Sequence, residues 1–149
     1  MKALIRHIKT EDTAKLVDLC ALHAEYEGAT YSKIGKKEKL EAFFNEHAEL
    51  VSGIVVEVDK VVVGYATYIK QLSTWDANTY IYMDCLFIEA SFRGKGLGKQ
   101  LMKWIIDDAK KLGCTIIQWQ TPEENTRAIQ FYQGLGAQSK SKQRFFLEL

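Results

Sequence analysis

A glycine-rich, basic stretch in the second half of the chain places the strongest constraint on the fold. Arg93 to Lys99 carries three glycines at alternate positions and three basic residues. A β-branched and aromatic run over 79–88 precedes it, and apolar residues recur at helical spacing over 96–112 after it. Such a turn from a strand into a helix lets the backbone approach a ligand, and the free N–H groups at the helix start attract anions. The stretch therefore predicts a phosphate site.

Two common nucleotide motifs do not fit this stretch. A Walker A loop needs a glycine upstream of its Gly-Lys pair and a Ser or Thr directly after it, but positions 93 and 100 are Arg and Gln. The dinucleotide fingerprint GxGxxG fails because the third glycine comes one residue early. The pattern that remains is Arg-x-x-Gly-x-Gly. A helix start that only needs flexible glycines stays open as the alternative at this point.

The order of the expected elements indicates one mixed domain. Asp59-Lys60 is expected to turn a hairpin, Thr10 to be an N-cap, and Gly28 and Gly113 to end helices. Helices and strands around one sheet make an α+β, or mixed α/β, fold. The 149 residues contain no linker or repeat, which predicts a single domain over 1–149. Strands are expected over 2–8 (at a sheet edge), 54–58, 61–66, 79–88, 115–120 and 144–149, and helices over 10–28, 36–50, 96–112 and 125–133.

Composition argues against several classes of protein. Lys and Arg number 20 against 19 Asp and Glu, a net charge of +1, so we do not expect nucleic-acid binding through overall charge. The three cysteines form no CxxC pair and the three histidines are scattered, so neither a disulfide framework nor a metal site is expected. No signal peptide and no apolar run of about 20 residues is present. We therefore expect a cytoplasmic protein without a metal or a membrane partner.

A second motif follows the glycine-rich stretch. Asn125, Ala128 and Tyr132 fall at i, i+3 and i+7, on one face of the helix expected over 125–133. Alone, this pattern also fits an ordinary helix with a buried tyrosine. Together with Arg93-x-x-Gly-x-Gly and the order of the elements, it resembles the GNAT superfamily of N-acetyltransferases over nearly the whole chain.

The resemblance implies a fold and a cofactor. The fold is a central mixed, mostly antiparallel sheet flanked by helices and splayed between its fourth and fifth strands, 79–88 and 115–120. Acetyl-CoA, the acyl donor, lies in the opening, with its pantetheine amides against the fourth strand and its pyrophosphate at the glycine-rich stretch. The residues that the resemblance assigns to acetyl-CoA are Leu86, Ile88, Arg93, Gly94, Lys95, Gly96, Leu97, Gly98, Lys99, Asn125 and Tyr132.

The chemistry of acetyl transfer to an amine gives two of these side chains roles. The amine must be neutral, and the departing thiolate must be protonated or stabilised. Tyr132, which the resemblance puts beside the thioester sulfur, can donate that proton. The candidate base is Asp84, because a carboxylate within a strand is uncommon. A carboxylate that touches the ammonium would raise the pKa of the amine, so Asp84 is expected to act through a water or by binding the amine first.

Within the superfamily the chain is most similar to the diamine (spermidine/spermine) N-acetyltransferases. The residues that carry this similarity would form an anionic, aromatic-lined amine site: Tyr26, Glu27, Trp75, Tyr82 and Asp84. Two features depart from that group, namely Cys85 in place of a second acid and the basic segment 140–144 in place of an acid and a tryptophan. We therefore expect a small amine or an amino acid derivative, and an acceptor with a carboxylate or phosphonate if the basic segment borders the site.

Two alternatives to a small-molecule enzyme remain. A protein or peptide N-acetyltransferase would need an open groove, which Trp75 is expected to cover, and a CoA-binding regulatory module would keep the fold without turnover. Tyr132 and Asp84 favour an enzyme. We predict an acetyl-CoA-dependent N-acetyltransferase for a primary amine of a diamine, polyamine or amino acid-like molecule. A homodimer is expected, with the apolar strand at 144–149 taking part.

Overall fold

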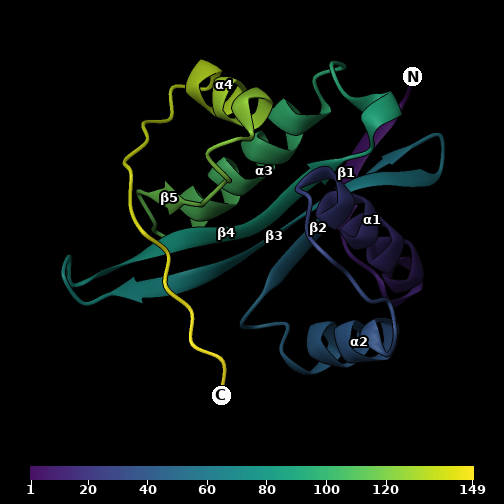
Figure 1. Cartoon of the computed structure of the whole chain (residues 1–149), viewed down its shortest axis with the longest axis horizontal. Helices are drawn as coiled ribbons and strands as arrows, with labels where there is room; N and C mark the ends of the chain where they lie inside the picture. The colour runs from purple at the N-terminus through teal and green to yellow at the C-terminus, as the bar shows by residue number, and fades with distance from the viewer.

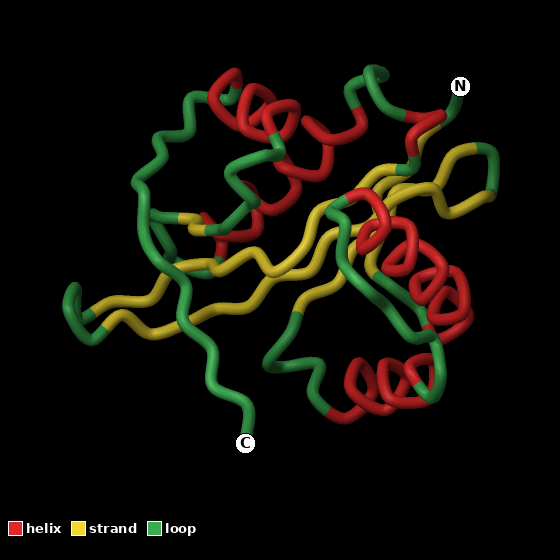
Figure 2. Tube along the Cα trace, viewed as in Figure 1, coloured by secondary structure: helices red, strands yellow, loops and turns green.

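One five-stranded sheet forms the centre of the molecule. The computed structural model describes residues 1–149. The strands follow the order β1-β2-β3-β4-β5, with antiparallel pairs up to β4 and a parallel pair between β4 and β5 (Figures 1 and 2). The sheet is therefore mixed and mostly antiparallel, as predicted. Its strands are β1 (Ala3–His7), β2 (Ser52–Val58), β3 (Val61–Ser73), β4 (Asn78–Ile88) and β5 (Ile117–Gln118).

Helices cover both faces of the sheet. Leu16 and Leu19 of one helix pack on Val55 and Phe87. Leu101 of another helix packs on the opposite face, against the next residues of the same strands, Val56 and Ile88. This alternation follows from the period of two along each strand. Figure 1 shows α1 and α2 on one side of the sheet and α3 and α4 on the other. The helices are η1 (Thr10–Asp12), α1 (Thr13–Tyr26), α2 (Lys36–Glu46), η2 (Ala90–Phe92), α3 (Leu97–Lys111) and α4 (Thr126–Gly134).

The hairpin between β2 and β3 confirms the prediction at Asp59-Lys60. These two residues have φ values of 49° and 68°. Positive φ at both central positions is the signature of a type I′ turn, whose twist matches that of the strands it joins. β3 continues seven residues beyond the expected 61–66 and, with β4, carries Trp75 out to the tip of a long second hairpin.

A β-bulge in β4 lies at Asp84. Thr67 pairs with Cys85 and Tyr68 with Met83, so Asp84 is an extra residue without a partner on β3. Met83 belongs to the core beneath α3, but Cys85 packs toward the core beneath α1. In a regular strand, residues two positions apart, such as Met83 and Cys85, would face the same side of the sheet. The bulge therefore changes the direction of every later side chain in β4.

β4 and β5 separate soon after they meet. They are paired only through Ile81 with Ile117 and Tyr82 with Gln118. Beyond Tyr82, the edge of β4 has no strand beside it, which confirms the splay between the fourth and fifth strands. β5 is shorter than the predicted 115–120 for the same reason.

Three local predictions are wrong. Thr10 does not cap a helix: the carboxylate of Asp12 accepts the Lys9 N–H at 2.7 Å and so takes the capping role. The second helix ends at Glu46, which leaves Ala48 outside it. The segment 144–149 forms no strand: it pairs with no edge of the sheet, and its apolar side chains are exposed.

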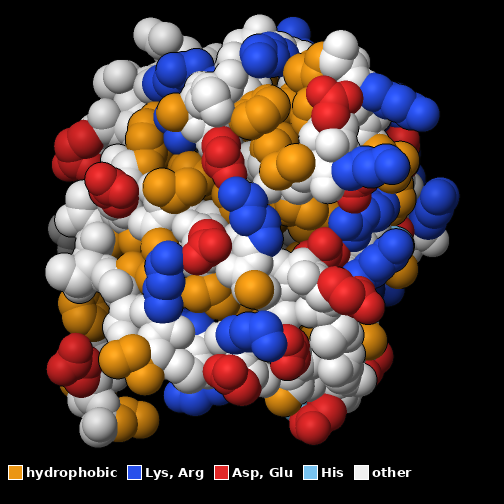
Figure 3. Space-filling view, turned by 90° about the vertical axis from the view of Figure 1, so that its right-hand side faces the viewer, with side chains coloured by type: hydrophobic (Ala, Val, Ile, Leu, Met, Phe, Trp, Pro, Cys, Tyr) orange, Lys and Arg blue, Asp and Glu red, His pale blue; other side chains and the backbone are white.

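The surface carries mixed charge. Lys and Arg side chains are interspersed with Asp and Glu over the face shown in Figure 3. No helix has the length and apolar character needed to cross a membrane.

Candidate active site

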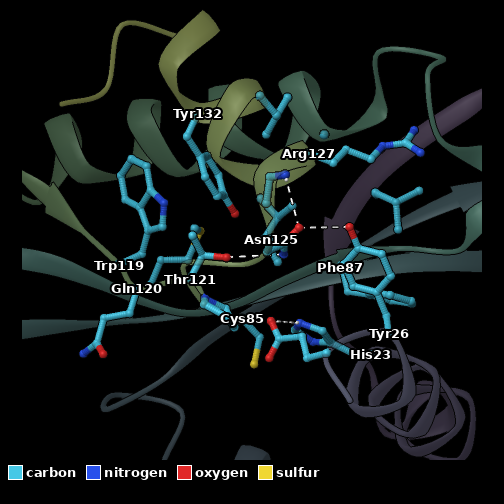
Figure 4. A pocket seen from close by; sticks show the side chains of 18 of the residues that line it. His23, Tyr26, Cys85, Phe87, Trp119, Gln120, Thr121, Asn125, Arg127 and Tyr132 are labelled. Carbon is cyan, nitrogen blue, oxygen red and sulfur yellow. Dashed lines mark hydrogen bonds and ion pairs between the residues drawn. The ribbon is translucent and has the colours of Figure 1, made fainter. Parts of the chain in front are cut away.

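A cleft of about 840 Å³ opens where β4 and β5 diverge. Its walls come from the end of α1, from β4 after Tyr82, from the loop into α3, from the segment after β5, from α4 and from the C-terminal segment. Figure 4 shows side chains from these elements converging on one space. The cleft therefore brings together most of the predicted site residues from separate parts of the chain.

Tyr132 reaches into the cleft from α4 (Figure 4). Its ring packs against Trp119 and Phe131, with centroid distances of 4.9 and 5.2 Å. Burial, with the nearby Glu27 carboxylate and Cys85 thiol, raises the pKa of the Tyr132 hydroxyl to about 12. The hydroxyl is therefore protonated at neutral pH and available as a donor.

The start of α3 borders the cleft and offers free backbone donors. Gly94 and Gly96 have φ values of 76° and 79°, a left-handed conformation that favours glycine. The Gln100 N–H donates to the Gly96 carbonyl at 3.2 Å, so the N–H groups of residues 97–99 have no acceptor within the helix. Gly98 has a different role, since a Cβ there would stand 3.0 Å from the Phe131 ring. Two glycines thus shape the turn, and the third lets α4 pack closely.

Arg93 is held away from the start of α3. Its Nε donates to the Ile88 carbonyl at 2.8 Å, and its guanidinium lies 4.4 Å from the centre of the Tyr26 ring and 5.2 Å from that of Phe87. The Tyr26 hydroxyl in turn donates to Asn125 Oδ1 at 3.0 Å. This chain of contacts crosses the cleft from α1 to α4. At one end, Arg93 already donates to the Ile88 carbonyl, which the similarity to the GNAT superfamily assigns to the cofactor.

Asn125 has a structural role as well as a place in the cleft. Its side-chain oxygen accepts the Ala128 N–H at 3.3 Å, which caps α4. Its amide donates to the Thr121 hydroxyl at 3.3 Å. The cap fixes the first turn of α4 and so the position of Tyr132, and Asn125, Ala128 and Tyr132 all line the cleft as one helical face.

Three carboxylates, Glu27, Asp84 and Glu123, line the cleft without a lysine or arginine partner, and the first two were expected in the amine site. Asp84 is exposed at the bulge, where the Cys85 thiol is 3.5 Å from its Oδ2. Glu27 lies 3.2 Å from Nε2 of His23, one helical turn earlier. Unpaired carboxylates in a cleft are suited to bind a cation.

His23 links Glu27 to the core. Its Nδ1 lies 3.0 Å from the Tyr65 hydroxyl, and its ring stacks on Phe87 at 5.0 Å. Burial raises the pKa of Tyr65 far above its usual range, so that hydroxyl stays protonated. The two ring nitrogens of His23 are thus engaged on opposite sides, Nδ1 with Tyr65 and Nε2 with Glu27. His23 therefore holds the Glu27 carboxylate at the cleft wall.

The Cys85 thiol is unsuited to be a nucleophile. Burial, with the Asp84 carboxylate beside it, raises the pKa of Cys85 to about 12. A thiol that stays protonated is inert as a nucleophile. No group of three or more His, Cys, Asp or Glu side chains is arranged to hold a metal ion.

Two predicted site residues lie outside the cleft. Trp75 is 95% exposed at the tip of the β3–β4 hairpin, because both strands extend past the sheet. The Lys95 amine lies over the Phe92 ring, 5.0 Å from its centre, and does not line the cleft. The expectation that Trp75 walls the amine site is therefore not met in this chain. The predicted residues that do line the cleft are Tyr26, Glu27, Tyr82, Asp84, Leu86, Ile88, Arg93, Gly94, Gly96, Leu97, Gly98, Lys99, Asn125 and Tyr132.

Sequence reasoning missed several lining residues. His23 was one of three scattered histidines, although its i, i+4 spacing from Glu27 on a helix was a usable signal. The basic segment 140–144, by contrast, was considered as a possible border of the site, and its Lys142 and Arg144 do line the cleft, from a part of the chain that forms no helix or strand. Trp119 and Gln120 follow the short β5, and Gln120 donates to the Tyr82 hydroxyl at 3.0 Å.

The sheet, its splay and the cleft beside a helix start define the architecture of an acyltransferase. Residues 16–137 match the Acetyltransferase (GNAT) family. The chain therefore belongs to the GNAT acetyltransferase family and is an acetyltransferase. GNAT acetyltransferases use acetyl-CoA as the acyl donor.

Proteins with described activities are similar over most of the chain. A thialysine N-epsilon-acetyltransferase of Bos taurus is 30% identical over 143 residues, which cover 91% of this chain and 84% of that protein. A probable spermine N(1)-acetyltransferase of Bacillus subtilis subsp. natto is 26% identical over 141 residues, with 93% and 89% covered. An integron cassette protein from V. cholerae has a similar structure, with a TM-score of 0.77 at 26% identity and coverage of 99% and 93%.

Proposed function

We propose that this chain transfers the acetyl group of acetyl-CoA directly to the primary amine of a small molecule. One observation carries the proposal: a protonated tyrosine hydroxyl, Tyr132, shares a cleft with carboxylates that have no lysine or arginine partner, Glu27 and Asp84 among them. The reaction needs an acid that protonates the departing thiolate and a group that binds the amine while it is still an ammonium ion. The names of the similar thialysine and spermine acetyltransferases support a small amine as the acceptor.

The residues around the cleft fit acetyl-CoA. The free N–H groups of residues 97–99 and the Lys99 side chain suit its pyrophosphate, because donors and the helix dipole favour an anion there. The unpaired edge of β4 leaves Leu86 and Ile88 as candidate partners for the pantetheine amides. The Ile88 carbonyl becomes free only if Arg93 gives up its 2.8 Å bond, so we expect the Arg93 side chain to move when acetyl-CoA binds.

Tyr132 is proposed as the general acid. The amine nitrogen forms a bond to the acetyl carbon, the carbon–sulfur bond breaks, and the sulfur takes the electron pair. The Tyr132 hydroxyl, held protonated by burial, can donate its proton to that sulfur. The high pKa of Cys85 argues against an acetylated cysteine on the way, which favours direct transfer.

Asp84 and Glu27 are proposed to handle the amine. A primary ammonium must lose a proton before it attacks, and a carboxylate in direct contact opposes that loss. Asp84 is exposed at the bulge and open to water, so it can accept the proton through a bound water. Glu27, held by His23, is proposed to bind the incoming ammonium, with Tyr26 and Tyr82 beside it.

The location and assembly of the protein are also proposed. Its three cysteines are free, which suits the reducing cytoplasm. Phe145, Phe146 and Leu147 are each more than four-fifths exposed, and contiguous apolar surface of this kind favours a homodimer. Light scattering on the purified chain tests the dimer directly.

The test of the proposed activity is CoA thiol release from acetyl-CoA with a panel of amines. The panel is putrescine, spermidine, spermine, lysine, ornithine and an aminoglycoside, each against a blank without amine. We expect release that depends on the amine and saturates with at least one short acceptor. Binding of acetyl-CoA without release from any amine would refute the proposal and favour a protein acceptor or a CoA-binding regulatory module.

A further inference from the structure

We propose that the C-terminal segment supplies an anion subsite, so that the acceptor is an amine that also carries a carboxylate or phosphonate. This inference rests on the proposed function and specifies its substrate class. Lys142 and Arg144 belong to a segment without helix or strand, yet both line the same cleft as Glu27 and Asp84. The cleft therefore holds both signs of charge.

The charged groups in this part of the cleft do not neutralise one another. No salt bridge within 4.0 Å involves Asp84, Lys142 or Arg144, and Glu27 is paired only with His23. Separate, unpaired charges of opposite sign can both be satisfied by a ligand that carries a cation at one end and an anion at the other. The amine would meet the carboxylates, and the anion would meet the two basic side chains.

The path of the C-terminal segment separates this subsite from the start of α3. In Figure 1 the segment leaves α4, passes β5 and crosses β4 and β3 toward the side that α1 and α2 cover. α3 lies on the opposite side of the sheet. Lys142 and Arg144 thus line the cleft from a different element than the start of α3, and that helix start with Lys99 remains for the pyrophosphate.

The layout also disfavours diamines. A second ammonium on the acceptor would meet Lys142 and Arg144, and juxtaposed like charges oppose binding. Arginine can hold a carboxylate or phosphonate through two hydrogen bonds, which lysine complements as a point charge. We expect ornithine to be a better acceptor than putrescine, which differs from it only by the missing carboxylate.

The experiment compares acceptors that differ only in the anion. kcat/KM is measured for ornithine against putrescine, for lysine against cadaverine, and for 3-aminopropylphosphonate, which separates phosphonate from carboxylate preference. The double variant Lys142→Gln/Arg144→Gln should lower kcat/KM for ornithine about tenfold, mainly through KM, because charge-assisted hydrogen bonds to the anion are lost. Activity with putrescine should rise, because the two charges that oppose its second ammonium are gone.

The chain offers a matched control and a reversal. Lys140→Gln removes the same charge from the same segment at a position that does not line the cleft, so it should leave the ornithine-to-putrescine ratio unchanged. Lys142→Glu/Arg144→Glu should invert the preference toward diamines. An unchanged ratio in the double variant, with transfer to amines intact, overturns the anion subsite alone. Failure of the parent protein to acetylate any amine overturns the proposed function and the subsite with it.

Discussion

Replacement of Tyr132 by phenylalanine is the sharpest test of the proposed acid. The change removes only the hydroxyl, and the ring keeps its contacts with Trp119 and Phe131 at 4.9 and 5.2 Å. No protein group is hydrogen-bonded to the Tyr132 hydroxyl. Removal of this hydroxyl therefore leaves no buried polar atom without a hydrogen-bond partner. We therefore expect the free energy of unfolding to change by less than about 1 kcal/mol.

The rate of transfer should respond far more strongly. Loss of a general acid lowers a rate by about 100- to 10,000-fold, which raises the barrier by about 3–5 kcal/mol. Because the pKa of Tyr132 is about 12, the parent rate should not decline through ionisation of this group until the pH approaches that value. Stopped-flow thiol release gives kcat, and calorimetry gives the Kd of acetyl-CoA, which should change little.

Tyr68→Phe is the matched control. The Tyr68 hydroxyl donates to Asp108 Oδ2 at 2.7 Å in the core, away from the cleft, so this variant should lose stability but not kcat. A Tyr132→Phe protein that is folded and transfers acetyl at a rate within threefold of the parent would refute the role of the hydroxyl as the acid.

Three further predictions concern stability and binding. Asp12→Ala should cost about 1.5–3 kcal/mol in urea unfolding, because the partly buried Arg6 guanidinium loses its 2.7 Å partner and keeps only Glu57 at 2.9 Å. The Arg6 contact lowers the pKa of Asp12, so this stabilisation is complete above its usual value of 3.8 and is lost as the pH falls through the lowered value in the folded state. Gly98→Val should lower the melting temperature, at a cost of about 1–3 kcal/mol, because even a Cβ would stand 3.0 Å from the Phe131 ring, and equal melting temperatures would contradict this. His23→Ala should raise the KM for the amine severalfold without a change in the KM for acetyl-CoA, and steady-state kinetics with both substrates separates the two.

Local signals explain what could be predicted from the sequence. The hairpin at Asp59-Lys60, the helix after Gly96 and the stop at Gly113 depend on residues within one turn of each other. The glycine-rich stretch and the face of α4 with Tyr132 are equally local. For these elements the pattern of apolar, glycine and capping residues is enough.

The rest depends on pairings between distant residues. The bulge at Asp84 exists only because Thr67 and Tyr68 of β3 meet β4 out of step, and no pattern within β4 announces it. The 144–149 segment is apolar but joins no edge of the sheet, so composition alone predicted a strand wrongly. Trp75 is assigned to the amine site by similarity to the diamine acetyltransferases, whereas its position at the tip of the β3–β4 hairpin depends on how far the two strands pair.

The site itself shows the same division. The spacing of His23 and Glu27 is local, but the hydroxyl that orients the His23 ring comes from Tyr65, 42 residues later. The hydrogen bond between Tyr26 and Asn125 joins residues 99 positions apart. Contacts of this length arise only when the whole sheet has formed, so they decide the geometry of the cleft while the motifs decide its chemistry.

The most direct measurement is a mass balance of the acetyl group. The protein is incubated with acetyl-CoA that carries a labelled acetyl group and with ornithine, and the small molecules and intact protein are analysed by mass spectrometry. We predict one acetylated acceptor for each CoA thiol released and no acetylated protein. Labelled acetyl on the protein, or thiol release without an acetylated amine, would contradict direct transfer within this cleft.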